Sequence, residues 1–154
     1  MRLWSGWLSG VIVRTPTYQE ALYPDNMEAI EYLKGVRDSG WRRMDAVDWV
    51  YQSWAYDAHN VGTSAGFNGD YHRALKSIKA KTLILAGSGD LLNPEYEAME
   101  AAQYIPDVRY VAINAQRPMG HVSGAGISAP ENELQNAEIA KFLDVVTQRG
   151  RLIQ

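Results

Sequence analysis

The sequence predicts an α/β protein in which a helical segment, residues 1–77, precedes a strand–helix–strand–helix segment, residues 78–154. Two observations carry this prediction. The continuous apolar run KTLILAG, from Lys81 to Gly87, is typical of a strand buried in a parallel sheet. A second short apolar run, VRYVAI, follows after a helical stretch. Strands that alternate with a helix indicate a crossover unit with the two strands in one sheet.

Two helices are expected in the first segment. The stretch NMEAIEYLKGVRD places apolar residues at helical spacing, and Asn26 is its expected N-cap. The stretch DAVDWVYQSWAYDAH also has one apolar face, made of Val47, Val50, Tyr51, Trp54 and Ala58. So much aromatic surface on short helices leads us to expect that this face packs over another part of the protein.

Two further helices are expected in the second segment. The stretch SGDLLNPEYEAMEAAQYI turns from a loop into a helix, with Asn93 as its expected cap and Pro94 at its first position. The last helix is expected from Glu131 to about Gln148, where apolar residues form a stripe. It would cover the sheet formed by the two strands.

The composition excludes several classes of function. The chain has 154 residues, a net charge of −3 and no cysteine, which suits one globular domain and excludes disulfides, thiolate metal sites and a cysteine nucleophile. A mildly acidic chain is not attracted to nucleic acid or to an anionic membrane. The sequence has no phosphate-binding glycine loop, no metal-ligand spacing of its histidines and no apolar run near the roughly 18 residues of a membrane span. We therefore expect a cytoplasmic protein without a cofactor, a metal, or a nucleic-acid or membrane partner.

Two polar residues follow the two expected strands. Asp90 comes after the strand that ends at Gly87, and His121 comes after the strand that ends near Ile113. Active groups in open α/β sheets gather beyond the carboxyl ends of the strands, so both loops can reach one edge. An aspartate that accepts from one imidazole nitrogen fixes the tautomer and leaves the other nitrogen facing a nucleophile. We predict that Asp90 and His121 are catalytic; the alternative is a turn residue and an ordinary loop histidine.

The stretch GTSAG, from Gly62 to Gly66, matches the G-x-S-x-G pattern of a serine nucleophile elbow. The order of Ser64, Asp90 and His121 is also the triad order of α/β hydrolases. An elbow, however, needs a buried strand before the serine and a helix directly after it. Here the end of a helix precedes the serine, and FNGDYHRAL, with one more glycine, follows it. We therefore expect Ser64 to be a loop residue and not the nucleophile.

The run GFNGDYHRALKSIKAKTLILAGSGDLLNPEYEAMEAAQYIP, followed later by MGH, resembles the carboxyl-terminal part of α/β-hydrolase-fold acyltransferases of the homoserine O-acetyltransferase type. The stretch DAVDWVYQSWAYDAHNVG resembles the lid of that family, and the resemblance covers about residues 1–148. It implies a partial α/β-hydrolase fold, with residues 1–77 as a lid-like segment and 78–154 as the carboxyl-terminal part of the core. It also implies a serine acyltransferase or esterase acting on a small acyl ester or acyl-CoA, with Asp90 as triad acid and His121 as triad base.

Two departures from the family pattern change what the resemblance implies. Family members are more than twice as long and carry their nucleophile elbow in the amino-terminal half, so we expect this chain to begin inside the lid and to be inactive alone. Their homoserine-binding members usually carry an acidic residue directly after the histidine, where this chain has Val122. Another acyl substrate, or plain hydrolysis, is then favoured.

The expected partner is therefore a missing amino-terminal half or a second copy of the chain. The alternative function is a non-catalytic, self-associating module or a truncated relative of the fold. This alternative stays open because two strands alone leave open edges and apolar faces that need cover.

Overall fold

The computed structural model describes residues 2–40, 42, 45–114, 116–124 and 129–151. Its helices and strands are, in chain order, α1 (Arg2–Trp7), the π-helix η1 (Leu8–Ile12), α2 (Pro16–Leu22), α3 (Asn26–Gly40), α4 (Ala46–Asp57), the 3₁₀ turn η3 (Val61–Thr63), α5 (Tyr71–Lys76), β1 (Thr82–Gly87), α6 (Glu95–Tyr104), β2 (Val108–Ile113), the 3₁₀ turn η4 (Gly120–Gly124) and α7 (Ala129–Arg151). This mixture of helices and strands agrees with the predicted α/β class.

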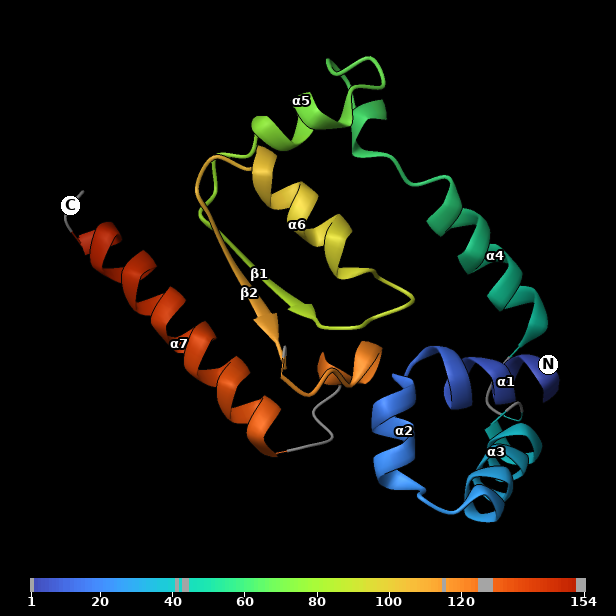
Figure 1. Ribbon diagram of the computed structural model, residues 1–154. Helices are drawn as coiled ribbons and strands as arrows, with labels where there is room; N and C mark the ends of the chain where they lie inside the picture. The colour runs from blue at the N-terminus through green and yellow to red at the C-terminus, as the bar shows by residue number, and fades with distance from the viewer. Residues whose placement is uncertain (1, 41, 43–44, 115, 125–128, 152–154) are drawn as a thin grey trace.

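The two strands form a small parallel sheet. Thr82 pairs with Val108 at one end and Gly87 with Ile113 at the other, so both strands end at the same edge. Helix α6 connects the strands, and α6 and α7 flank them on opposite sides in Figure 1. Both runs predicted as strands are strands, and the side chain at the carboxyl end of β2, Ile113, is only 2% exposed. Part of the buried core, Ala86 and Ile113, therefore lies at the carboxyl end of the sheet.

The N-caps of two helices differ from the prediction. Helix α3 is capped by Asp25 and not by Asn26, because the Asp25 carboxylate accepts from the amide of Met27 at 2.8 Å. Helix α6 has Pro94 at its N-cap position and no side-chain cap. The side chain of Asn93 is hydrogen-bonded elsewhere, in the candidate site described below.

The amino-terminal helices form a small cluster around α3. Helix α1 lies along α3, and the fully buried Ser5 donates its hydroxyl to the carbonyl of Val36 at 3.1 Å. The rings of Tyr23 and Tyr32 stack at 4.6 Å, which holds the end of α2 against α3. This contact packs the connection between α2 and α3 against α3.

The apolar face predicted on α4 is exposed. Tyr51 is 63% exposed and Trp54 is 62% exposed, while Trp49 meets Trp4 edge-on at 5.8 Å between ring centroids. The expectation that this face packs over another part of the protein is not met within the described residues. Helix α4 instead extends from the helical cluster toward the region of α5 and α6 (Figure 1).

Gly62 is required by a close backbone approach. A Cβ atom on Gly62 would lie 2.6 Å from both the carbonyl oxygen of Gly69 and the amide nitrogen of Tyr71. We expect Gly62→Ala to lower the free energy of unfolding by about 1–3 kcal/mol, since the backbone has to shift. Gly35→Ala is the control, because nothing lies within 4 Å of the added methyl group in α3. This substitution should raise the free energy of unfolding by roughly 0.5–1 kcal/mol. Urea unfolding of both variants measures the two effects, and equal effects would mean that the close approach does not constrain residue 62.

A salt bridge between Arg109 and Glu138 connects strand β2 to helix α7. Arg109 donates from Nε to Glu138 Oε2 at 2.9 Å and also from Nη2, while Lys141 donates to Glu138 Oε1 at 2.7 Å. The bond from Lys141 and, next, the bond from Arg109 lower the pKa of Glu138 below its ordinary value of 4.5. The Glu138 side chain is 7% exposed, so both carboxylate oxygens are engaged close to the sheet.

The lowered pKa of Glu138 predicts an acid-sensitive contact. A carboxyl whose pKa is lower in the folded state stabilises the fold above its unfolded pKa, and this stabilisation is lost as the pH falls through the folded pKa. We expect Glu138→Gln to remove part of the loss of stability below about pH 4.5. Urea unfolding at a series of pH values tests this, with Glu133→Gln, an exposed neighbour, as the control. If the free energy of unfolding fell equally steeply with decreasing pH in Glu138→Gln and in the parent chain, the prediction would be wrong.

Candidate active site

Asp90 is held by a tight turn after β1. Gly89 has a φ of +73°, which suits glycine, and the turn lets the amide of Asp90 donate to the carbonyl of Gly87 at 3.3 Å. The Oδ1 atom of Asp90 accepts from the backbone amides of Leu92 at 2.8 Å and Asn93 at 3.0 Å. The side chain is 8% exposed. One carboxylate oxygen is thus fixed by the backbone, and Oδ2 is left to meet a second group.

His121 is held by a second loop that is bound to the first. Gly120 has a φ of +80° and donates its amide to the carbonyl of Ser88 at 3.1 Å. On the other side, Val122 donates its amide to the carbonyl of Val13 at 3.2 Å. A Cβ on Gly120 would lie 3.2 Å from that same carbonyl oxygen. The loop after β2 is therefore clamped between the loop after β1 and the chain that leads into α2.

These two loops bring Asp90 and His121 together. The Nδ1 atom of His121 lies 2.9 Å from Oδ2 of Asp90. The imidazole is 41% exposed, and among the described residues no hydrogen bond engages its Nε2 atom. An aspartate on Nδ1 and a second ring nitrogen without a hydrogen bond are the arrangement that a histidine needs to act as a general base.

Asn93 is a third side chain at this site. Its Nδ2 atom lies 3.4 Å from Nδ1 of His121, and its Oδ1 atom accepts the hydroxyl of Tyr56 at 2.7 Å. Tyr56 is on α4, so this contact joins the exposed helix to the loop after β1. Sequence reasoning assigned Asn93 to a helix cap and did not find this role, because its partners lie 37 and 28 positions away.

Ser64 is placed away from this pair. It ends the turn η3 with φ −60° and ψ 151°, an ordinary extended conformation, and it is exposed. The segment 61–70 lies beside α5, at the opposite end of the strands from η4 (Figure 1). Neither the strained bend nor the preceding strand of a nucleophile elbow is present at Ser64.

Comparison with known proteins gives the chain its relatives. It is 36% identical over 98 residues to a homoserine O-acetyltransferase of Ascobolus immersus, an alignment that covers 64% of this chain and 18% of the relative. It is 33% identical over 79 residues to that of Chloroherpeton thalassium, covering 51% and 20%, and 32% identical over 85 residues to that of Trichormus variabilis, covering 55% and 23%. The chain is similar to homoserine O-acetyltransferases. This finding confirms the predicted resemblance.

The similarity to homoserine O-acetyltransferases is local. The chain spans only about a fifth of the length of these curated relatives. No family model matches it. At the position after His121 the chain has Val122, so the side chain next to the imidazole is apolar.

An open groove lies between α4 and α6. It has a volume of about 600 Å³ and is lined by Gln52, Ala55, Tyr56, His59 and Glu97. Tyr56 belongs both to this groove and to the network that reaches His121. The groove is therefore connected to His121 through Tyr56 and Asn93.

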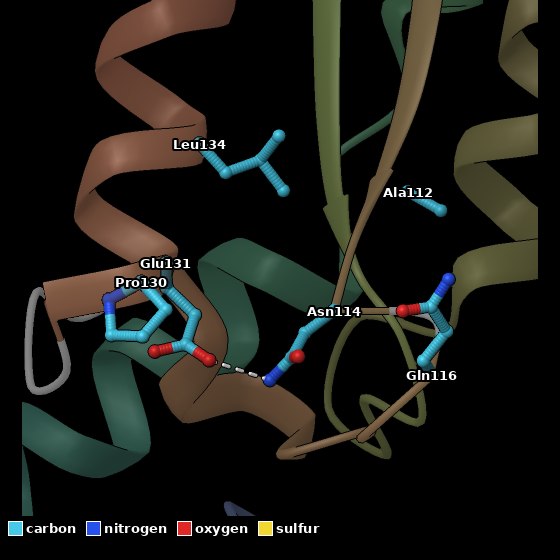
Figure 2. A pocket seen from close by; sticks show the side chains of 6 residues that line it. All are labelled: Ala112, Asn114, Gln116, Pro130, Glu131 and Leu134. Atoms are coloured by element: carbon cyan, nitrogen blue, oxygen red, sulfur yellow. Dashed lines mark hydrogen bonds between the residues drawn. The ribbon is translucent and has the colours of Figure 1, made fainter.

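A second hollow lies beside the start of α7 (Figure 2). It has a volume of about 310 Å³, and Asn114 and Glu131 face each other in it. Asn114, with a φ of +65°, donates to Oε1 of the buried Glu131 at 2.7 Å. This bond fixes the end of β2 to the first turn of α7, where a carboxylate is also favoured by the helix dipole.

The other histidines have different surroundings. His72 stacks on Tyr104 at 3.9 Å and lies 3.4 Å from Glu100, so it joins α5 to α6. The bond from Tyr71 to Glu100 raises the pKa of Tyr71 to about 12.

Within the described residues, no group of three or more histidine and carboxylate side chains is arranged to hold a metal ion. In the same residues, no helix combines the length and the apolar character that crossing a bilayer requires.

Proposed function

We propose that this chain supplies the aspartate and histidine of a Ser-His-Asp triad in an acyltransferase or esterase with the α/β-hydrolase fold. The observation that carries the proposal is the distance of 2.9 Å between His121 Nδ1 and Asp90 Oδ2, at the carboxyl edge of a parallel sheet. The similarity to homoserine O-acetyltransferases supports acyl transfer as the class of reaction.

In the proposed reaction, a serine hydroxyl attacks the carbonyl carbon of an acyl ester or acyl-CoA while Nε2 of His121 takes its proton. Asp90 Oδ2 accepts from Nδ1–H, which keeps Nε2 bare beforehand and stabilises the imidazolium afterwards. The tetrahedral intermediate then expels the alcohol or thiol, which receives the proton from Nε2. A second alcohol, or water, then attacks the acyl-serine with His121 again acting as base.

The nucleophile in this proposal comes from outside these 154 residues. Ser64 lies in an exposed turn, and the segment that holds it is at the other end of the strands from η4. Residues 78–154 then act as the carboxyl-terminal part of the catalytic core and residues 1–77 as a lid-like segment. We expect the isolated chain to be inactive for this reason. Val122 beside His121 favours an acyl acceptor without an amino group at that position, or water.

A graft tests this function. In the Trichormus variabilis homoserine O-acetyltransferase, the corresponding segment is replaced by a segment of this chain that includes Asp90 and His121, and hydrolysis of p-nitrophenyl acetate is measured. We expect turnover in the chimaera, none in the isolated 154-residue chain, and a loss in the chimaera with His121→Ala. His72→Ala is the matched control, since that imidazole contacts Glu100 outside the site. Turnover by the isolated chain that Ser64→Ala abolishes would contradict the proposal.

A non-catalytic, self-associating module is the second candidate. The observation that favours it is the exposed aromatic face of α4, with Tyr51 and Trp54 both more than half exposed, together with a sheet of only two strands. Such surfaces are usually covered in a stable assembly. Sedimentation velocity of the isolated chain distinguishes the candidates, since self-association predicts a dimer or larger species at micromolar concentration. A compact monomer would rule out this second function.

A further inference from the structure

Asn93 links helix α4 to the imidazole of the candidate site. Its amide oxygen accepts the Tyr56 hydroxyl at 2.7 Å, and its amide nitrogen lies 3.4 Å from Nδ1 of His121. The same Nδ1 atom lies 2.9 Å from Oδ2 of Asp90. A carboxylate oxygen, which accepts hydrogen bonds, and an amide nitrogen, which donates them, thus both lie near one ring nitrogen.

These two contacts on Nδ1 require different protonation of that atom. The ionised carboxylate of Asp90 only accepts hydrogen bonds, so it is satisfied by Nδ1–H. The amide nitrogen of Asn93 only donates, so it is satisfied by a bare Nδ1. A neutral imidazole carries one proton, and that proton is either on Nδ1 or on Nε2. Asp90 and Asn93 therefore favour opposite tautomers of His121.

We propose that Asn93, oriented by Tyr56, is a positioning residue that competes with Asp90 for Nδ1 and thereby sets the tautomer balance of His121. The bond to Asp90 is charge-assisted and shorter, so the Nδ1–H tautomer predominates. Asn93 lowers the ratio of the Nδ1–H tautomer to the Nε2–H tautomer. In the minor tautomer, the proton has left Nδ1 for water and another has returned at Nε2, so the charge of the ring is unchanged.

The tautomer balance connects α4 to the base. Only the tautomer with a bare Nε2 can take a proton from a serine, and this consequence rests on the function proposed above. When the Tyr56 hydroxyl leaves Asn93, the amide can turn and present its oxygen to Nδ1–H, which favours the competent tautomer. Tyr56 also lines the groove between α4 and α6. A substrate that enters this groove and displaces the Tyr56 hydroxyl would therefore raise the population of the His121 tautomer that can act as a base.

The experiment measures the tautomer and needs no activity. The full 154-residue chain, labelled with ¹⁵N, is studied by long-range ¹H–¹⁵N NMR of the His121 ring, at a pH where the ring is neutral. Tyr56→Phe and Asn93→Ala are each expected to shift the tautomer ratio toward Nδ1–H by roughly two- to tenfold, the range that one net hydrogen bond supplies. Asp90→Ala should shift the ratio the other way.

Two controls make the result decisive. Tyr96→Phe removes an exposed hydroxyl that bonds only to Glu97 within the described residues, and it should leave the ratio unchanged. Tyr56 and Asn93 are both exposed, so their variants are expected to fold, which circular dichroism verifies. An unchanged ratio in Tyr56→Phe and Asn93→Ala, or a shift toward Nε2–H, would overturn the inference. Because the proposed function is tested by turnover of the chimaera, each claim can fail while the other stands.

Discussion

Asp90→Asn in the chimaera is expected to lower kcat on the order of 10⁴-fold, with little change in KM. The reason lies in how the backbone holds Asp90. Its Oδ1 atom accepts from the amides of Leu92 and Asn93, so an asparagine at position 90 would keep its oxygen there. Its NH₂ group would then replace Oδ2 and face Nδ1 of His121. A donor at that place favours the tautomer in which Nε2 already carries a proton and cannot act as a base.

Steady-state kinetics with p-nitrophenyl acetate measures the effect of Asp90→Asn. The matched control is Asp70→Asn, because Asp70 also caps a turn of backbone, at the start of α5, and does not touch His121. We expect the control to retain kcat within a few-fold. If Asp90→Asn retained more than a tenth of the parent kcat, Asp90 would not have the assigned role.

Ile113→Ala is expected to produce one of the largest losses of stability in the chain, about 2–5 kcal/mol. The side chain is 2% exposed and stands at the carboxyl end of β2. The backbone carbonyl of Ile113 also accepts the amide of Ser88 at 3.0 Å, which links the loop after β1 to the end of β2. Removing the side chain leaves a cavity at the carboxyl end of β2, where the chain continues toward His121.

Urea unfolding tests this effect, with Ile113→Val as the matched control. The smaller truncation should cost about 0.5–1.5 kcal/mol. We also expect the low-field proton resonance of the His121 Nδ1–H group to broaden in Ile113→Ala, because the loops are less constrained. A cost below that of Ile113→Val would contradict the placement of buried core at the carboxyl end of the sheet.

The strands and the Asp90–His121 pair could be predicted because short-range signals determine them. A continuous apolar run such as residues 81–87 has few alternatives to a buried strand, and two parallel strands necessarily end at one edge. Asp90 lies three residues beyond β1 and His121 eight residues beyond β2, so both are in loops that leave this edge of the sheet. The motif GTSAG could be rejected for the same kind of reason, since its flanking sequence has no strand.

The parts that could not be predicted depend on contacts distant in sequence or on competition between neighbours. Asn93 has the local sequence pattern of a helix cap, but its amide oxygen accepts the hydroxyl of Tyr56, which lies 37 positions earlier in the chain. Asp25 and Asn26 are both good caps, and only the backbone geometry decides between them. The aromatic pattern of α4 predicts a buried face, yet Trp54 is 62% exposed, because nothing within the described residues covers it.

His121, oriented by Asp90, is proposed above to activate a serine that does not belong to this chain. Labelling of the chimaera with a fluorophosphonate, followed by peptide mass spectrometry, tests this most directly, since the reagent reacts with activated serine nucleophiles. The predicted result is one modified serine in the part contributed by the Trichormus variabilis relative, with labelling lost in His121→Ala and unaffected by Ser64→Ala. Modification of Ser64, or labelling that persists without the imidazole of His121, would contradict the proposed role of this pair.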